Sequence, residues 1–173
     1  MTTDELKALV RDVPDFPREG IVFKDLMPLI GNGEAFHATV GHLADWARPR
    51  RPDVILGAEA RGFIFGGALA YEFGCGFVPA RKPGKLPWEK IRATYELEYG
   101  SDSLEIHADA FEKGARVIVL DDVLATGGTA QAKVELVERL GGEVVGALFV
   151  IELAFLNGRE KLPGTDVHAL IAY

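Results

Sequence analysis

The chain has 173 residues, of which 48% are hydrophobic and 26% charged, with a formal net charge of −7 at pH 7. This length suits one domain with a sizeable core, and no apolar run approaches the roughly 20 residues of a membrane span. The acidic charge and the lack of a basic tail argue against extended nucleic-acid binding. Cys75 is the single cysteine and cannot form an internal disulfide, which favours a reducing, cytoplasmic location.

The first half of the chain predicts helices and one strand–loop–helix unit. Residues 1–11 mix charged and apolar residues as an amphipathic helix does, and they do not resemble a signal peptide. A second amphipathic helix is predicted over about residues 35–46. The elements expected next are a strand at 54–56, a loop at 57–62, a helix at about 63–73 and a short strand beginning at 77–78.

A basic region with different character follows. Residues 81–88 read Arg-Lys-Pro-Gly-Lys-Leu-Pro-Trp, and the prolines and glycine exclude a regular helix or a central strand. Residues 95–99 and 104–106 alternate polar and apolar around Gly100-Ser101-Asp102, which predicts a hairpin. A long basic excursion between core strands is typical of a lid, and the simpler alternative is a solvated surface loop.

The second strand–loop–helix unit is the most informative part of the chain. Residues 117–120 read Val-Ile-Val-Leu and predict a strand buried on both faces, as in a parallel sheet. Asp121 and Asp122 follow where this strand should end. The elements after them are a Thr-Gly-Gly-Thr loop at 126–129, a helix at about 129–140 and a strand at 144–151. Strands alternating with helices in this way predict an α/β protein with a mostly parallel sheet covered on both sides.

The loop at 126–129 suits a phosphate, because glycines close around an oxyanion, hydroxyls donate, and helix-start amides carry partial positive charge. Carboxylates cannot bind a phosphate, so Asp121 and Asp122 should face sugar hydroxyls, unless an Asp merely caps the helix. Two carboxylates about 4 Å apart repel by roughly 4 kcal/mol at an effective dielectric of about 20, so a ligand, a cation or divergent side chains should relieve them. Since neighbours in a strand point to opposite faces, one of the two acids can be purely structural, and the sequence does not rank them.

A second anion-binding turn follows the first predicted strand. Ala60, Arg61 and Gly62 open a helix there, and the guanidinium of Arg61 suits phosphate oxygens unless it pairs with Glu59. Two phosphate-binding turns, an acid pair and a basic lid describe a site for a sugar with a phosphate at one end and a diphosphate at the other. Phosphoribosyl pyrophosphate fits that description.

The acid pair and the loop Ala125-Thr126-Gly127-Gly128-Thr129 resemble the signature of the type I phosphoribosyltransferases. The resemblance implies the fold of that family: a single domain over 1–173 with a mostly parallel twisted sheet, helices on both faces, a small N-terminal hood at 1–34 and a flexible lid hairpin at about 81–106. Further matches to the family lie at residues 16–25, 59–63, 81–87, 95–100 and 104–107.

Within that family, the loop and the lid resemble the members that accept adenine. The resemblance implies purine salvage: the 5-phosphoribosyl group passes from phosphoribosyl pyrophosphate to adenine, giving AMP and pyrophosphate. It also implies a homodimer that binds neither nucleic acid nor membrane, and Mg²⁺ held mainly by substrate and water, without dedicated protein ligands. Oxopurine-specific relatives carry an Asp at the position of Ala125, so hypoxanthine and guanine are not expected as substrates.

The resemblance also implies a role for each matching residue. Adenine should lie between Phe23 and Val123, with main-chain groups of Val22 and Lys24 reading its edge. Glu98 matches the proposed general base of the family, and Arg61, Lys82 and Lys85 should stabilise the departing charge. The remaining assignments are Asp121 and Asp122 to the ribose hydroxyls, Ala125, Thr126, Gly127, Gly128 and Thr129 to the 5′-phosphate, and Ala60, Arg61, Gly62, Lys82 and Lys85 to pyrophosphate.

Three rival functions remain open from the sequence. One is a non-catalytic regulator on the same fold that senses phosphoribosyl pyrophosphate and binds nucleic acid, which the acidic charge disfavours. Another is an enzyme for a different base, such as xanthine or orotate. The third is a nucleotide phosphatase or kinase, which is disfavoured because the sequence has no G-x-x-x-x-G-K-[ST] loop.

Overall fold

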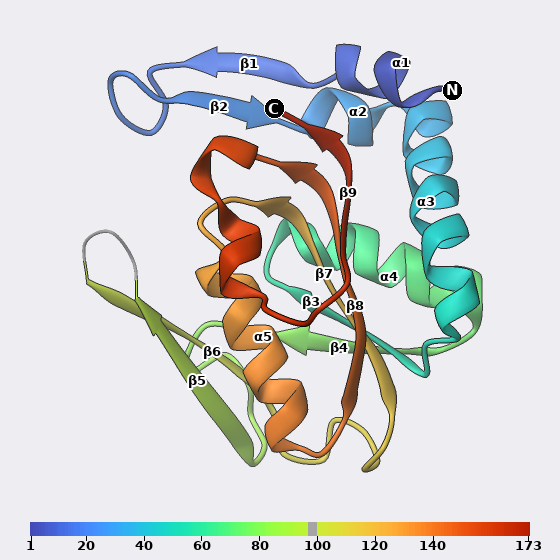
Figure 1. Ribbon diagram of the computed structural model, residues 1–173, viewed down its shortest axis with the longest axis vertical. Coiled ribbons are helices and arrows are strands. Elements are labelled where there is room, and N and C mark those ends of the chain that lie inside the picture. Colours follow the sequence, from blue (N-terminus) through green and yellow to red (C-terminus); the bar gives the residue numbers. More distant parts are fainter. Residues whose placement is uncertain (97–99) are drawn as a thin grey trace. The chain divides into compact units, whose positions relative to one another are not determined.

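The computed structural model describes residues 1–96 and 100–173 (Figure 1). They form two compact units, one over Met1–His42 and one over Leu43–Tyr173. No helix among these described residues is both long enough and apolar enough to cross a bilayer.

The N-terminal unit begins with a short helix and a hairpin. α1 (Thr3–Ala8) starts in a capping box, in which the Thr2 hydroxyl accepts the Glu5 amide and the Glu5 carboxylate accepts the Thr2 amide. β1 (Arg11–Pro14) pairs antiparallel with β2 (Val22–Asp25). The helix predicted over residues 1–11 is therefore wrong after Ala8, because the chain becomes extended where β2 can pair with it.

Two helices follow the hairpin. α2 (Met27–Gly31) is short, and α3 (Gly33–Ala47) confirms the amphipathic helix predicted over about 35–46. Asn32 caps the start of α3, since its side-chain oxygen accepts the amides of Glu34 and Ala35.

The C-terminal unit contains a parallel sheet with crossover helices and an inserted hairpin. Its elements, in chain order, are η1 (Arg48–Arg50), β3 (Val54–Ala58), α4 (Arg61–Phe73), β4 (Gly76–Ala80), β5 (Lys90–Glu96), β6 (Ser101–His107), β7 (Arg116–Leu124), α5 (Gly128–Arg139), β8 (Glu143–Glu152), η2 (Ala154–Leu156), η3 (Gly158–Lys161) and β9 (Val167–Ala172).

Five of these strands form one parallel sheet in the order β4-β3-β7-β8-β9 (Figure 1). The crossover through α4 carries the chain outward from β3 to β4, and the crossover through α5 carries it the other way, from β7 to β8. The adjacent strands β3 and β7 are therefore the topological switch point of the sheet. Loops at the carboxyl ends of such strands are where open α/β sheets bind ligands.

The core explains why residues 117–120 are uniformly apolar. α5 and α4 pack on the two sides of the sheet (Figure 1), so all four side chains of this segment are fully buried. On the α5 side, Leu136 and Val137 belong to the same buried cluster as Val117 and Val119. The α/β class with helices on both faces is therefore confirmed.

Two local expectations differ from the structure. β7 continues to Leu124, which pairs with Glu152 on β8, so Asp121 and Asp122 lie inside the strand and not beyond its end. The reason is that β8 is long enough to keep pairing with β7 beyond the apolar run. β9 was not foreseen, because its single short apolar run lacks a following helix or strand.

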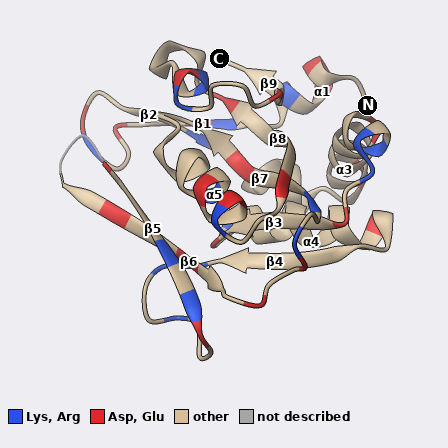
Figure 2. Ribbon diagram, turned by 60° about the horizontal axis from the view of Figure 1, so that its bottom comes forward, with Lys and Arg blue, Asp and Glu red and all other residues tan. Residues whose placement is uncertain are grey.

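β5 and β6 form a separate antiparallel hairpin inserted between β4 and β7, and they carry residues of both charge signs (Figure 2). The hairpin confirms the strand predicted at 104–106, and β5 (Lys90–Glu96) begins earlier than the strand predicted at 95–99, whose residues 97–99 lie outside the described residues. The turn predicted at Gly100-Ser101-Asp102 is shifted, because Ser101 already pairs with Glu96, and Asp102 with Tyr95.

Candidate active site

The turn from β7 into α5 is shaped by two glycines. Gly127, just before α5, has a φ of +85°, and a Cβ there would lie 2.3 Å from the carbonyl oxygen of Gly158 on η3. A Cβ on Gly128 would lie 2.9 Å from the ring of Tyr95 on β5. A side chain at either position would displace its neighbour. Because glycine cannot cap a helix with a side chain, the first amides of α5 can bind an anion instead.

Asp121 and Asp122, both on β7, pair with two different cations. Asp121 Oδ2 accepts a hydrogen bond of 2.8 Å from Lys133 Nζ on α5. Asp122 Oδ2 accepts a hydrogen bond from Arg61 Nε at the start of α4. Pairing with a cation, one of the remedies expected from the sequence, therefore serves both acids, while the two carboxyls stay close enough for the charge of Asp121 to act on Asp122.

Asp122 is a deeply buried carboxyl, with 6% of its surface exposed. Burial raises its pKa, the charge of Asp121 raises it further, and the Arg61 guanidinium opposes both, so that the pKa lies at about 6. A sugar hydroxyl donates most strongly to an ionised carboxylate. Binding of such a hydroxyl is therefore linked to loss of the Asp122 proton.

Lys133 is a site residue that the sequence reasoning missed. Its side chain is fully buried, and Nζ donates to the Leu120 carbonyl and to Asp121, each at 2.8 Å. The available signal was helical spacing: position 133 lies three residues after Ala130 and four before Val137, both expected to face the sheet. A lysine on such an apolar face needs a buried partner.

The turn after β3 places Arg61 beside the acid pair. The alternative in which Arg61 pairs with Glu59 is wrong, since Glu59 binds Arg81, with Arg81 Nη2 2.9 Å from Glu59 Oε2. Gly62 packs on the acid pair, because a Cβ on it would lie 2.8 Å from Asp121 Oδ1. Ala60 precedes α4 and follows Glu59 through a cis peptide bond.

Glu59 ties this turn to the beginning of the basic loop. Its Oε1 accepts the Lys82 amide at 2.6 Å, while its Oε2 accepts from Arg81. Burial opposes ionisation of Glu59, but the Lys82 amide and the Arg81 guanidinium together hold its pKa below the ordinary value. The charge of Lys85 contributes in the same direction. Arg81 is thus a structural cation of the loop.

The two predicted lid lysines differ in their surroundings. Lys82 Nζ is bound to Asp102 on β6 and lies 3.4 Å from the Tyr95 hydroxyl. Desolvation lowers the pKa of Lys82, but its interactions with Asp102 and Tyr95 together outweigh this effect, and the pKa is raised. Lys85, in contrast, is exposed.

The other predicted phosphate residues lie along the same turn. Ala125 and Thr129 are half-buried and Thr126 is exposed. The structure therefore brings the predicted phosphate loop, the acid pair and Ala60-Arg61-Gly62 together at the switch point. Val123, predicted to contact the base, lies on β7 in the same unit and is half-buried.

The predicted base-binding residues at the start of the chain belong to β2 in the N-terminal unit. Phe23 contacts the ring of Phe16 edge-on at 5.3 Å, Val22 is 49% exposed, and Lys24 binds Asp12. Glu98, the predicted general base, lies outside the described residues.

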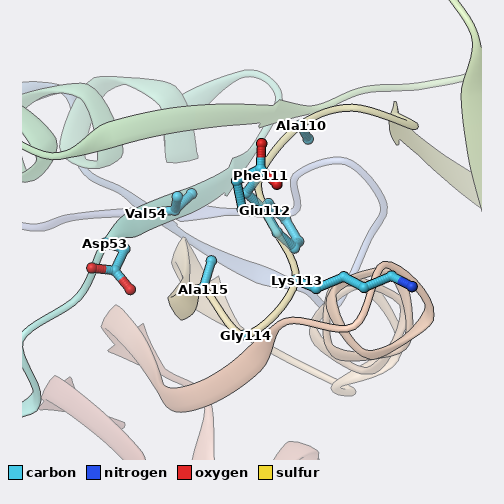
Figure 3. A pocket seen from close by; sticks show the side chains of 8 residues that line it. All are labelled: Asp53, Val54, Ala110, Phe111, Glu112, Lys113, Gly114 and Ala115. Atoms are coloured by element: carbon cyan, nitrogen blue, oxygen red, sulfur yellow. The ribbon is translucent and has the colours of Figure 1, made fainter.

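A surface pocket of about 440 Å³ is lined by none of the predicted site residues (Figure 3). It is lined by Asp53 and Val54, at the start of β3, and by residues 110–115, which precede β7, so it lies at the end of the sheet where these strands begin. Asp53 is already engaged, since its carboxylate accepts the Arg116 amide at 2.8 Å. The pocket therefore adds no group to the candidate site. Elsewhere in the described part of the chain, no cluster of three or more His, Cys, Asp or Glu side chains could hold a metal ion.

Comparison with known proteins agrees with this geometry. Residues 30–163 match the phosphoribosyl transferase domain family. An adenine phosphoribosyltransferase of Thermotoga maritima is 52% identical over 169 residues, which cover 98% of each chain. The crystal structure of adenine phosphoribosyltransferase from Thermoanaerobacter pseudethanolicus superimposes with a TM-score of 0.97 at 52% identity, covering 99% of this chain and 100% of that one. The Saccharomyces cerevisiae enzyme, crystallised with adenine and an imino-altritol bisphosphate, gives a TM-score of 0.92 at 46% identity, with 97% of each chain covered.

A parallel sheet with an acid pair and a glycine-shaped turn at its switch point fits a phosphoribosyltransferase, and the chain belongs to that domain family. Its fold is the type I phosphoribosyltransferase fold expected from the resemblance. Within the family it belongs to the adenine phosphoribosyltransferases, since relatives of that kind match it along almost its whole length.

Proposed function

We propose that the chain transfers the 5-phosphoribosyl group of phosphoribosyl pyrophosphate to adenine, as its family does, with the β7–α5 junction holding the ribose 5-phosphate. The single observation that carries this proposal is that two carboxylates near the carboxyl end of β7 are followed directly by the uncapped start of α5. The amides and hydroxyls from Ala125 to Thr129 suit the phosphate, and Asp121 and Asp122 suit the ribose hydroxyls.

The reaction breaks the bond between the anomeric carbon and a pyrophosphate oxygen and forms a bond from that carbon to an adenine nitrogen. Negative charge grows on the departing pyrophosphate as positive charge grows on the sugar ring. Arg61, Lys82 and Lys85, with the backbone of Ala60 and Gly62, are assigned to the leaving group. Arg61 is half-exposed and can exchange Asp122 for the diphosphate.

Mg²⁺ forms part of the proposal as a partner of the substrate. Arg61 and Lys133 already pair with the two acids, so these carboxylates are not needed as metal ligands. This fits a magnesium ion that would be held by the diphosphate, ribose hydroxyls and water. When bound, magnesium would neutralise the negative charge that develops on the departing pyrophosphate.

The adenine nitrogen must lose a proton, and Glu98 is assigned as the base from its place in the sequence. Glu98→Gln should lower turnover by about 100-fold or more while leaving the KM for phosphoribosyl pyrophosphate within a few-fold. Steady-state rates at saturating substrates measure this. An unchanged turnover number would remove Glu98 from the mechanism.

Adenine is proposed to lie against Phe23 and Val123, with main-chain groups of Val22 and Lys24 at its edge. The family resemblance supports these residues, and the yeast relative crystallised with adenine supports adenine as the base. Phe23→Ala should raise the KM for adenine more than the KM for phosphoribosyl pyrophosphate, because only the base loses a stacking surface.

The chain is further proposed to act as a homodimer in the cytoplasm. Ile64 and Tyr71 on α4 support a protein interface, because they are 39% and 91% exposed and lie seven residues apart on one helix. The lone Cys75 and the family resemblance support a reducing compartment. Analytical ultracentrifugation tests the dimer, and a single monomeric species at micromolar concentration would contradict it.

A base-competition assay with purified protein tests the activity itself. The expected result is AMP formation from adenine, with hypoxanthine and guanine used at least about 100-fold less efficiently, since a polar site discriminates strongly between hydrogen-bonding edges. Preferred use of an oxopurine would overturn the assignment of the base. Saturable binding of labelled DNA at physiological salt, without AMP formation, would favour the alternative of a non-catalytic, nucleic-acid-binding regulator.

A further inference from the structure

Lys133 is a buried charge that the proposed reaction leaves without a role. None of its surface is exposed, and Nζ binds the Leu120 carbonyl and Asp121 Oδ2, each at 2.8 Å. The same Nζ lies 5.9 Å from the centre of the Phe149 ring. Burying an ammonium group costs several kcal/mol unless it is paired and hydrogen-bonded. A helix facing an apolar sheet would be more simply built with leucine or methionine at this position.

The two cations of the acid pair differ in whether they can leave it. The Arg61 side chain is 43% exposed and stands at the start of α4, whereas the Lys133 side chain is completely enclosed between α5 and β7. In the proposed reaction Arg61 turns toward the diphosphate. Lys133 then remains as the fixed cation of the pair, because nothing in its position allows it to follow a substrate.

Asp121 is committed to the protein through both of its oxygens. Oδ2 accepts from Lys133, and Oδ1 accepts the Asp122 amide at 3.0 Å. The ion pair therefore fixes Asp121 and, through the Oδ1 bond, the backbone from which the Asp122 side chain extends. It also joins the strand with the ribose-binding acids to the helix with the phosphate-binding amides.

We propose that Lys133 is a positioning residue for catalysis, which neutralises Asp121 so that Asp122 stays ionised and placed to accept the ribose hydroxyls when Arg61 moves to the diphosphate. This inference rests on the proposed function. Lys133 touches no substrate in this mechanism and acts through Asp121.

The charges around Asp122 support this assignment. α4 contributes Arg61, β7 contributes Asp121, and α5 contributes Lys133 through Asp121. β3 is entirely apolar, and on β8 the nearest charged residue is Glu152, which Arg159 holds at 2.7 Å. Within the described residues the protonation of Asp122 thus depends on these groups, and the pKa of about 6 leaves little margin at neutral pH.

The test compares Lys133→Met, Asp121→Asn and the double variant with the unaltered protein. For each, kcat/KM for phosphoribosyl pyrophosphate is measured from about pH 5 to about pH 9. In Lys133→Met the acid limb should move up by about one pH unit, because Asp121 then repels Asp122 without compensation. The KM for phosphoribosyl pyrophosphate at neutral pH should rise more than the KM for adenine.

The double variant separates charge from packing. In the double variant neither the negative charge of Asp121 nor the positive charge of Lys133 acts on Asp122. The acid limb of the profile should therefore return to its original pH or below it. Lys161→Met removes an exposed lysine and serves as the control, with an unchanged profile. A folded Lys133→Met protein with the original acid limb overturns the proposal.

Loss of folding in Lys133→Met would still leave the proposal testable. The double variant should then fold and show the original acid limb, and a double variant that also fails to fold would reduce Lys133 to a packing role and overturn the proposal. The unaltered protein distinguishes the proposed function from the proposed role of Lys133. If the unaltered protein forms no AMP, the proposed function fails. If it forms AMP but the acid limb does not move in the variants, only the proposed role of Lys133 fails.

Discussion

The β7–α5 junction presents the acids Asp121 and Asp122, whereas the basic loop before β5 presents Arg81, Lys82 and Lys85. The two regions also differ in rigidity. At the junction the cation facing Asp121 is fully buried, and a Cβ on Gly127 would lie 2.3 Å from a neighbouring carbonyl oxygen. In the basic loop the Lys82–Asp102 pair is partly exposed on both sides. The junction is fixed before any ligand arrives, and the loop holds its charges in pairs that water can reach.

This difference indicates how the work of binding is divided. In the proposed function the junction, whose acids are already held by hydrogen bonds and ion pairs, binds one shape, a ribose 5-phosphate, with little change in its backbone. A screened pair can exchange its carboxylate for a diphosphate at small cost, because exposed ion pairs contribute only about 0–1 kcal/mol. Tyr95 connects the regions, since its ring lies against Gly128 and its hydroxyl lies 3.4 Å from Lys82 Nζ.

The largest effect is expected at the rigid junction. Gly127→Ala places a methyl group against the Gly158 carbonyl at a positive φ, so the loop must move. Displacement of this kind should lower kcat/KM for phosphoribosyl pyrophosphate by about 100-fold. Gly164→Ala is the matched control: its φ of +78° imposes the same strain, but no atom lies within 4 Å of the added Cβ. Equal losses in both variants would contradict a special role for the junction.

A smaller effect is expected at the cation shared between the regions. Arg61→Ala removes a charge from Asp122 and from the diphosphate, and the KM for phosphoribosyl pyrophosphate should rise on the order of 30-fold. The KM for adenine should change little, because the base does not meet this side chain in the proposed site. Separate titrations of the two substrates measure this, with Arg48→Ala as a control on an exposed ion pair. A parallel rise in both constants would count against the placement of Arg61.

The pKa of Asp122 predicts opposite pH trends for activity and stability. Below about pH 6 the carboxyl is protonated, so kcat/KM for phosphoribosyl pyrophosphate should fall about tenfold per unit. The pKa in the folded protein exceeds the unfolded value of about 3.9, so Asp122 stabilises the ligand-free protein at low pH, and this contribution is lost as pH rises through about 6. Thermal unfolding with and without AMP tests the second trend. In Asp122→Asn both dependences on this group should disappear.

The smallest effect is expected in the exchangeable loop. Asp102→Asn releases Lys82 from its resting partner, so the KM for phosphoribosyl pyrophosphate should fall about two- to threefold. Asp109→Asn removes an exposed acid of the same region and should have no effect. A raised KM in Asp102→Asn would show that Asp102 positions Lys82 for the substrate and does not compete with it.

The same contrast explains what could be predicted from the sequence. Residues 117–129 encode a buried strand, an acid pair and a helix start in one continuous segment, so local pattern predicted the junction and its chemistry. β3, α4 and the α5 crossover followed from periodicity for the same reason. The end of β7 was placed too early, because it depends on pairing with β8, about 30 residues further along.

Pairing across the fold was the harder part. Which acid meets which cation depends on α4 and α5 packing against β7, and neither Arg61–Asp122 nor Lys133–Asp121 is visible in local spacing. The β1–β2 hairpin was missed as well, because its strands have four residues each and the first was absorbed into a helical pattern. Elements this short contain too few residues for the spacing of apolar side chains to distinguish a helix from a strand.

A crystal structure of the protein with bound AMP tests the central claim most directly. We expect the phosphate to accept hydrogen bonds from backbone amides of residues 126–129, with a ribose hydroxyl donating to Asp122. AMP bound elsewhere, with the turn after β7 closed by its own side chains, would contradict the proposed site.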